Sequence, residues 1–482
     1  MKKTSANKTP ANNTPVIKTP VNKTPAVRTA DAVIGYLPDE TPSPGKLIVF
    51  ALQQILVMFP ATVLVAILTG FDIGVTIFAS GLATLGFLFV TRGKIPLYYG
   101  SSFAYIAAIC GLMGAQMAKG ASDIDAIRMA QFGIVMSGLV SIAAGLVASR
   151  FGADAIEKVL PPTITGSIAL TIGMSLAAVA LSNASGSGAG DFLTTASSKD
   201  PVAVASWIIA ILTLIATILF SIHLKKTAGQ LPLLFGVIFG YILAAFATVA
   251  LDIRLIDFSA IANANVVQVP RFTLPLPNWA AIAAIMPIAI ATIPESTAHL
   301  FQLDIYVNEL ARNKKSKKVY DIGNRLGSNL IGDGLGDIIS GMIGGPAGTN
   351  YGENISTMAI TRNFSVRMLG AASIITMILS FSGILSQLVY SIPACVIGGI
   401  SVYLFGVIGA QGIAIMINKK VDMFDTRNLA VISTVLVIGI GGSFINGGMI
   451  PVFGLEIPAI ATASIFGILL NLLLNIGKNK NM

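Results

Sequence analysis

The chain has 482 residues, of which 54% are hydrophobic and only 11% are charged, whereas about 25% of the residues in an average soluble domain are charged. This composition excludes a water-soluble globule and predicts a polytopic membrane protein, because uncharged runs such as 47–68 and 457–476 are each about long enough to cross a bilayer as one helix. The formal net charge of +9 comes from basic residues scattered between the apolar runs, so it predicts no nucleic-acid-binding patch.

Residues 1–45 form a polar stretch in which a Thr-Pro pair recurs every five residues from Thr9 to Pro25. Proline at this density is incompatible with a helix or a sheet. The sequence therefore predicts a disordered cytoplasmic tail, either a plain solvated extension or a docking or phosphorylation segment. No apolar core follows its basic start before Leu47, unlike a cleaved secretory signal.

Hydropathy divides the rest of the chain into about fourteen apolar segments. In chain order they cover residues 47–68, 74–91, 97–115, 130–149, 161–182, 203–222, 231–251, 279–302, 326–345, 351–361, 368–390, 393–416, 428–446 and 457–476. With both termini in the cytoplasm, every Lys and Arg lies on the cytoplasmic side except Lys119, Arg128, Lys199, Arg254 and Arg271. This positive-inside bias predicts an even number of crossings of the cell inner (plasma) membrane, without distinguishing fourteen from twelve.

Two segments differ from ordinary membrane helices because Gly, Pro and small polar residues interrupt them at membrane depth. They are residues 96–103 (PLYYGSSF) and 344–353 (GGPAGTNYGE). Backbone that leaves the helix inside a bilayer is tolerated only where protein or a water-filled cavity satisfies its amides. Paired breaks therefore predict a substrate site near the midplane, and the similarity of residues 161–166 to 393–398 supports two inverted repeats, as in secondary transporters.

Four acidic residues fall within the predicted spans or broken segments, namely Glu295, Asp333, Asp337 and Glu353. A charged side chain at the centre of a membrane helix costs about 2.5–3.5 kcal/mol on insertion scales, so such residues usually face a cavity. Asp333 and Asp337, one turn apart in a glycine-rich segment, fit a structural or a functional role. Glu295 and Glu353 are the predicted functional pair, and His299 shares one helix face with Glu295.

Glu353 directly follows Gly352, where the second broken segment resumes as a helix. The amides at such a helix start donate hydrogen bonds, and carboxylates accept them. A small planar solute with alternating N–H and C=O groups, such as a nucleobase, would satisfy both kinds of group, whereas the acids would repel an inorganic anion. Burial and a neighbouring negative charge both favour the protonated form of a carboxyl group, which is the chemical basis for proton coupling.

On these residues the chain resembles the nucleobase-cation symporter family 2, also called the nucleobase-ascorbate transporters, and within it the bacterial uracil permeases. The resemblance runs from Leu47 to the end of the chain and is carried by blocks 53–59 (QQILVMF), 93–104 (GKIPLYYGSSFA), Glu295 with His299, 351–355 (YGENI), 358–362 (MAITR) and 406–410 (GVIGA). The family implies an all-α protein with about fourteen transmembrane segments in two inverted seven-segment repeats, and short strands in segments 3 and 10. It also implies a core domain at 46–149 and 279–390 and a gate domain at 161–251 and 393–476.

The resemblance also implies roles for single residues. Glu295 and Glu353 would hold the base, and both would take part in proton coupling together with His299. The backbone amides of Phe103 and Gly352 would donate to the carbonyl oxygens of the base. The full set of residues implied to line the substrate site is Ser102, Phe103, Glu295, Tyr351, Gly352, Glu353 and Phe405.

Glu353 favours a pyrimidine, because purine-transporting relatives typically have Gln at the matching position. The chain departs from the family pattern at Gln54, Pro294, Ala298 and Phe405, and these departures bear on the range of bases. The predicted function is proton-coupled uptake of uracil or a closely related pyrimidine by alternating access. A xanthine or other purine symporter on the same fold is the alternative, and an anion exchanger or channel of related architecture is a further rival.

No nucleophile motif, phosphate loop or metal-ligand cluster accompanies the paired acids, so the sequence predicts a transporter and not an enzyme. No cofactor and no metal are expected, and the two cysteines, Cys110 and Cys395, both lie inside apolar runs. The expected partners are the nucleobase, protons and the lipid bilayer, with no nucleic acid. The family often forms dimers, so the resemblance also implies a homodimer.

Overall fold

The computed structural model describes residues 35–152, 158–186, 200–225, 228–445, 448–452 and 455–476. The Thr-Pro pairs of the predicted tail lie outside these residues. The first half of the described chain contains α1 (Pro44–Thr69), α2 (Ile73–Val90), β1 (Tyr99–Ser101), α3 (Ile106–Ala118), α4 (Asp123–Phe151), α6 (Pro162–Ser175), α7 (Ala177–Ala184), α9 (Pro201–His223), α10 (Pro232–Ala250) and α11 (Phe258–Ala262). The second half contains α12 (Trp279–Ile285), α13 (Ala289–Asn313), α14 (Leu326–Ile343), β2 (Gly348–Asn350), α15 (Gly352–Thr361), α16 (Val366–Leu379), α17 (Gly383–Tyr390), α18 (Ala394–Asn418), α19 (Thr426–Leu436), β3 (Met449–Val452), β4 (Leu455–Pro458) and α20 (Ala459–Asn475).

Local sequence sets where several of these helices begin and end. Asp72 caps α2, because its Oδ1 accepts a hydrogen bond from the Val75 amide at 2.9 Å. Ser122 caps α4 in the same way through the Asp125 amide at 3.2 Å. Gly70 ends α1 at a φ of 76°, a left-handed conformation that glycine adopts without strain. Short polar or glycine-containing connections thus delimit the apolar helices.

The two glycine- and proline-rich stretches meet as an antiparallel pair of three-residue strands. The pairing places Tyr99 opposite Asn350, Gly100 opposite Thr349 and Ser101 opposite Gly348. β1 leads through a 3₁₀ turn, η1 (Phe103–Tyr105), into α3, and β2 leads into α15. Helix α2 supports β1, because the Ser80 hydroxyl donates to the Tyr99 carbonyl at 2.7 Å and Thr84 accepts from the Tyr99 amide at 3.0 Å. The protein itself therefore satisfies this non-helical backbone.

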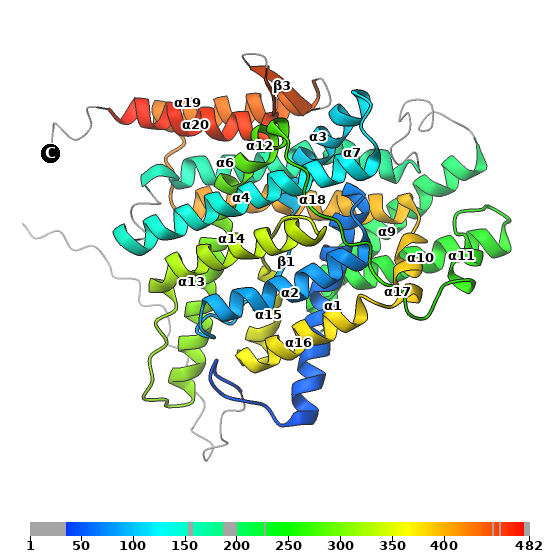
Figure 1. Cartoon of the computed structure of the whole chain (residues 1–482), viewed down its shortest axis with the longest axis horizontal. Helices are drawn as coiled ribbons and strands as arrows, with labels where there is room; N and C mark the ends of the chain where they lie inside the picture. The colour runs from blue at the N-terminus through cyan, green and yellow to red at the C-terminus, as the bar shows by residue number, and fades with distance from the viewer. Residues whose placement is uncertain are drawn as a thin grey trace, which may run out of the picture. The chain divides into compact units, whose positions relative to one another are not determined.

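A second antiparallel pair, β3 with β4, precedes the last helix. The pairing runs from Met449 opposite Pro458 to Val452 opposite Leu455, and Figure 1 shows β3 beside α19 and α20. The sequence predicts strands only in the two broken segments and places residue 457 in the last span. That part of the expectation is corrected: residues 455–458 are a strand, and α20 begins at Ala459.

Eight helical stretches of the described chain are long and apolar enough to cross a bilayer, and they comprise α1, α2, α4, α6 with α7, α9, α10, α12 with α13, and α18. Shorter apolar helices occupy Phe103–Ala118, Val366–Leu379, Thr426–Gly441 and Ala459–Asn475. The predicted span 368–390 is divided between α16 and α17. The chain is therefore a mostly helical, multi-pass membrane protein, while the count of fourteen crossings stays a prediction.

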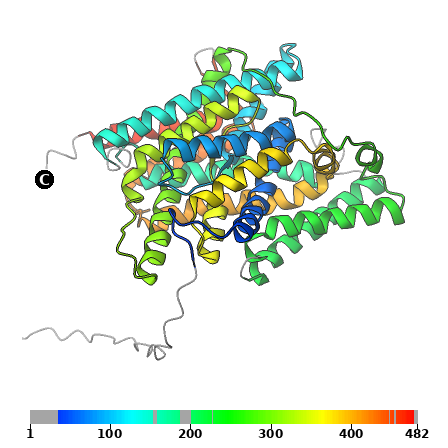
Figure 2. The same cartoon turned by 60° about the horizontal axis from the view of Figure 1, so that its bottom comes forward.

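Helices from the two halves of the chain pack against each other in two groups. α14 packs against α4 and α2, and α16 packs against α2, whereas α18 packs against α6, α7 and α9. Figures 1 and 2 show α4, α14, α2 and α16 side by side. Glycine permits this close approach, because a Cβ on Gly138 of α4 would lie 2.4 Å from the carbonyl oxygen of Gly334 of α14. A Cβ on Gly166 of α6 would lie 2.7 Å from the carbonyl oxygen of Gly412 of α18.

Residues 35–43, which belong to the predicted tail, are hydrogen-bonded and ion-paired to the rest of the protein. The Tyr36 amide donates to the Arg362 carbonyl at 2.7 Å, at the end of α15. The Lys314 ammonium group lies 2.6 Å from the Glu40 carboxylate, just after α13. The packed part of the chain therefore begins before residue 46.

Candidate substrate site

Glu295 and Ser296 are neighbours on α13 but have opposite surroundings. The Glu295 side chain is exposed and accepts no hydrogen bond from another described residue, whereas Ser296 is 2% exposed. Successive residues of a helix point about 100° apart, so one helix presents the acid to an open space and the hydroxyl to the protein interior. The preceding Pro294 lies inside the helix, and it removes one backbone hydrogen bond beside the acid.

Ser296 belongs to a buried polar network that joins α13, α14 and β2. Its hydroxyl donates to the Asp333 carboxylate and accepts a hydrogen bond from Asn329 Nδ2 at 2.6 Å. Asn350 of β2 donates to Asn329 Oδ1 at 3.2 Å. All four side chains are buried. The network holds the helix segment that carries Glu295 at a fixed position relative to the strands.

Asp337 connects both strands to α14. Its Oδ1 accepts hydrogen bonds from the Tyr99 hydroxyl and from the Gly348 amide, the latter at 2.8 Å. The Tyr99 ring packs on the glycines around it, since a Cβ on Gly336 would lie 2.5 Å from this ring. Of the two roles that the sequence left open for Asp337, these contacts favour the structural one.

Glu353 is the second residue of α15 and its side chain is exposed. The helix start is anchored to α1, because Asn354 Nδ2 donates to the Gln54 side chain at 2.8 Å and to its carbonyl at 3.0 Å. The Gly352 amide donates to no other described residue, and the same is true of the Phe103 amide at the start of η1. Each strand of the pair therefore ends at an amide that can donate to a ligand.

The two exposed acids lie in one neighbourhood. The Glu295 and Glu353 carboxyl groups are close enough to interact electrostatically, and both lie within electrostatic range of the Tyr351 hydroxyl. The region therefore holds two acceptors, one from α13 and one from α15, and the Gly352 amide precedes the second of them in the chain.

His299 packs against the start of α15. A Cβ on Gly352 would lie 2.8 Å from His299 Nε2, so glycine is required for this contact. The Nδ1 atom of His299 is buried without a hydrogen-bond partner. In the described chain His299 makes no hydrogen bond to Glu295. Its expected role in support of Glu295 stays a prediction, and its observed contact is with the helix that carries Glu353.

The aromatic residues of the predicted site fall into two classes. Phe103 is half-buried and its ring meets the Phe405 ring edge to face, with centroids 6.4 Å apart and planes at 70°. Tyr351 is 4% exposed, and its hydroxyl donates to the Ser101 carbonyl at 2.9 Å. Ser102 is 1% exposed and caps η1. Tyr351 thus supports the strands and Ser102 caps the turn after β1, while Phe103 is the half-buried ring of the set and packs on the buried Phe405 ring of α18, which is 1% exposed.

Charge alone did not reveal the uncharged members of the buried network. Ser296 and Asn329 lie in predicted spans and Asn350 in the second broken segment, and all three carry polar groups that are costly to bury without partners. The sequence nevertheless contains a signal for them, because each of these side chains lies within four residues of an intramembrane acid. Among the described residues, no group of three or more His, Cys, Asp or Glu side chains is arranged to hold a metal ion.

Comparison with known proteins places this site in a family. A sequence model of the Permease family matches residues 45–448. The chain belongs to this family, the nucleobase-ascorbate transporters. It is therefore a membrane transporter and not an enzyme.

Three similar relatives are uracil permeases. The uracil permease of Bacillus caldolyticus is 34% identical over 441 residues, which cover 90% of this chain and 93% of the relative. The uracil permease of Bacillus subtilis (strain 168) is 33% identical over 441 residues, with 90% and 94% covered. The uracil permease of Escherichia coli (strain K12) is 34% identical over 437 residues, with 90% and 92% covered.

Solved structures of more distant proteins share the fold. The transmembrane domain of the cyanobacterial bicarbonate transporter BicA matches with a TM-score of 0.58 at 15% identity, over 85% of this chain and 98% of that chain. The murine anion transporter Slc26a9 in its inward-facing state matches with a TM-score of 0.60 at 15% identity, over 95% of this chain and 74% of that chain. At this identity the likeness concerns the fold alone.

Proposed function

We propose that this chain imports uracil, or a closely related pyrimidine base, together with protons across the inner (plasma) membrane of the cell. The observation that carries the proposal is the pair of exposed, unpartnered carboxyl groups of Glu295 and Glu353 beside the paired strand ends. The uracil permeases among its relatives, which this chain matches over nearly their whole length, support the choice of base.

The donors and acceptors match the edge of a uracil ring. Its two N–H groups would donate to Glu295 and Glu353, and its two carbonyl oxygens would accept from the Phe103 and Gly352 amides. The half-buried Phe103 ring would offer an apolar face to the flat heterocycle, and the buried Phe405 ring would hold it in place from behind. Tyr351 and Ser102 would shape the site through the strands that they support.

Transport would proceed by movement of a core domain (46–149 and 279–390) against a gate domain (161–251 and 393–476). The packing supports this division, because α14 contacts α4 and α2 and α2 contacts α16, while α18 contacts α6, α7 and α9. The order helix, helix, strand, helix occurs in α1, α2, β1 and α3 and again in α13, α14, β2 and α15. The antiparallel crossing of β1 and β2 is the arrangement that two inverted repeats would produce.

Labelled uracil uptake into proteoliposomes tests the substrate. We expect saturable uptake that excess unlabelled uracil abolishes. Xanthine and hypoxanthine should compete with it only weakly. Saturable xanthine uptake that uracil does not affect would refute a pyrimidine substrate and support the purine alternative. Uptake of labelled bicarbonate by vesicles that take up no base would instead favour the anion rival, to which the fold is equally suited.

Proton coupling is tested in the same vesicles. An inward proton gradient should accelerate uracil uptake, and a protonophore should remove the acceleration. Uptake that is indifferent to the gradient would refute the coupling but not the choice of substrate.

Two further expectations belong to the same proposal. Both termini would be cytoplasmic, so that the basic loops Lys314–Lys318 and Lys419–Lys420 lie inside. The chain would form homodimers in the bilayer, as the family resemblance implies. Protease accessibility of tagged termini in oriented vesicles and cross-linking in the membrane test these two points.

A further inference from the structure

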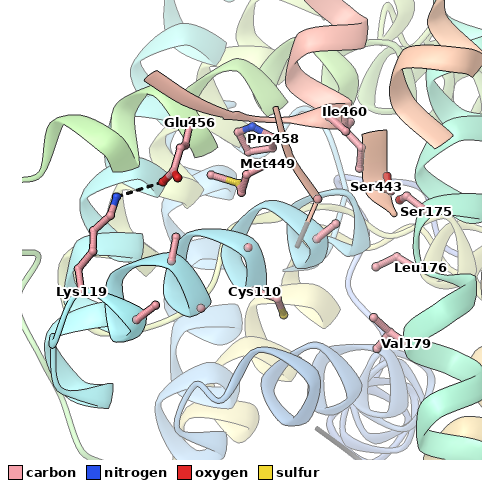
Figure 3. A pocket seen from close by; sticks show the side chains of 17 residues that line it. Cys110, Lys119, Ser175, Leu176, Val179, Ser443, Met449, Glu456, Pro458 and Ile460 are labelled. Atoms are coloured by element: carbon pink, nitrogen blue, oxygen red, sulfur yellow. Dashed lines mark hydrogen bonds and ion pairs between the residues drawn. The ribbon is translucent and has the colours of Figure 1, made fainter. Parts of the chain in front are cut away.

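A cavity of about 510 Å³ lies between α3 on one side and α6, α7, the β3–β4 hairpin and α20 on the other (Figure 3). On the α3 side its wall consists of small residues, among them Ala107, Gly111, Gly114 and Ala118. These positions recur every three or four residues, so they form one face of the helix. The cavity is therefore a groove along α3, and the side chains that line it on this helix are too small to fill it.

The first residue of α3 that lines the groove, Ala107, packs on the same apolar cluster as Phe103 of the proposed substrate site. Ala107 lies one helical turn after Phe103, whose amide and ring belong to that site. The groove then follows α3 to Lys119, the residue that ends the helix. Its opposite wall comes from elements of the proposed gate domain, including Ser175, Val179 and Pro458.

One ion pair joins the two walls at the rim of the groove. The Lys119 ammonium group, at the end of α3, lies 3.0 Å from Glu456 Oε2 on β4 (Figure 3). The side chains are 60% and 38% exposed. An ion pair with this exposure contributes little to stability, which suits a contact that must form and break in each transport cycle.

We propose that this groove is the route by which the base reaches Phe103 from the Lys119 face of the membrane, and that the Lys119–Glu456 pair is a latch between core and gate across its rim. The inference rests on the proposed function for the identity of the base. The latch itself depends only on the geometry of α3 and the hairpin.

The groove contains a native cysteine, so its accessibility can be measured by thiol labelling. Cys110 lines it and is half-buried, and its thiol donates to the Leu68 carbonyl at 3.3 Å. Cys395, the other cysteine, is 1% exposed and packs in a separate apolar cluster. A small neutral maleimide should therefore modify Cys110 selectively, and the Cys110→Ala variant serves as the unlabelled control.

The first test measures the labelling rate of Cys110 in the full-length protein in liposomes. Lys119→Glu places like charges at the rim, and we expect labelling to become about two- to fivefold faster, the range that one exposed ion pair supports. The exchange variant Lys119→Glu/Glu456→Lys should restore the original rate. The control variant is Lys318→Gln, which removes a similarly exposed ion pair with Asp39 away from the groove. It should leave the labelling rate of Cys110 unchanged. Equal rates in all four proteins, or no rescue by the exchange, would overturn the latch.

The second test asks whether the groove is the route. Modification of Cys110 should block labelled uracil uptake, saturating uracil should slow the modification, and Cys110→Ala should transport normally after maleimide treatment. Full uptake by protein with modified Cys110 would overturn the route. Absence of uracil uptake by the untreated protein would instead count against the proposed substrate. The labelling rates of Cys110 would still show whether the Lys119–Glu456 pair acts as a latch.

Discussion

Two pairs of acids lie in the same membrane region and have opposite surroundings. Asp333 and Asp337 on α14 are 7% and 3% exposed and accept hydrogen bonds from side chains and backbone of α13, β1 and β2. Glu295 and Glu353 are exposed and accept no hydrogen bond from another side chain of the described structure. The first pair builds the site, and the second pair is left for a ligand.

This contrast shows why charge at membrane depth is not sufficient to identify a binding residue. All four acids carry the same cost of insertion, so that cost alone does not separate the two pairs. They differ in whether the protein supplies donors to them. Substitutions at the two pairs should accordingly affect different properties, namely folding for α14 and transport for α13 and α15.

The largest effect is expected for Asp337→Ala. The substitution leaves the Gly348 amide and the Tyr99 hydroxyl buried without their acceptor, and each such loss costs about 1–3 kcal/mol. The protein should lose most of its thermal stability in detergent, as measured by the melting temperature and by the yield of monodisperse protein. Wild-type stability of this variant would place Asp337 among the ligand-binding acids instead.

Glu353→Gln should leave folding intact and impair function. The exposed side chain makes no contact that holds the fold, but a hydrogen bond to a charged group contributes about 1.5–3 kcal/mol, which corresponds to roughly 10- to 100-fold weaker uracil binding. Competition by xanthine should improve relative to the wild type. An unchanged melting temperature is the control, and unchanged uracil affinity would contradict the assignment.

Glu295→Gln should separate binding from coupling. The amide keeps an acceptor oxygen, so uracil should still bind, but the side chain can no longer exchange a proton. Uptake by the wild type should fall as the external pH rises, whereas residual uptake or exchange by the variant should not respond to pH. Parallel pH profiles for the two proteins would remove Glu295 from the proton path.

Phe103→Ala and Phe405→Ala should weaken uracil binding by about two- to tenfold each, because an aromatic contact contributes about 0.5–1.5 kcal/mol beyond area burial. The two effects should be less than additive, since the rings contact each other. Phe272→Ala removes a comparable edge-to-face contact with Phe78 away from the site and should not change affinity.

The smallest effect is expected at the segment before α1. Although partial burial opposes ionisation, hydrogen bonds from Lys318 and Tyr320 outweigh it and hold the pKa of the Asp39 carboxyl below its ordinary value. A carboxyl group whose pKa is lowered by folding stabilises the fold at pH values above its ordinary pKa. This contribution is lost as the pH falls through the lowered pKa. Asp39→Asn should thus lower the melting temperature at neutral pH by about 1 °C, and this difference should vanish in acid. A difference that grows in acid would contradict the sign.

Hydropathy and turn residues were sufficient to predict much of this architecture. The stretches 96–103 and 344–353 were predicted to be broken because Gly and Pro interrupt apolar runs, and they contain β1 and β2. The division of 368–390 into two helices went unnoticed, because the residues at the break, Ser380 to Ser382, leave the run uncharged and apolar overall. The β3–β4 hairpin was missed for a related reason, since its strands are short and mostly apolar.

The candidate site shows the same division. Glu295 and Glu353 could be predicted because an intramembrane acid is costly and rare. Which acids are satisfied by the protein depends on Ser296, Asn329 and Asn350, and these meet only through contacts between α13, α14 and β2. No local pattern encodes such long-range bonds, so the sequence left the role of Asp333 and Asp337 open until their contacts were seen in the fold.

Direct binding of labelled uracil to purified protein tests the central claim, which is that the open acids hold the base. Wild-type protein should bind uracil saturably, the Glu295→Gln/Glu353→Gln double variant should bind none at the same concentrations, and Asp39→Asn should bind like the wild type. Equal binding by the wild type and a folded double variant would contradict the account.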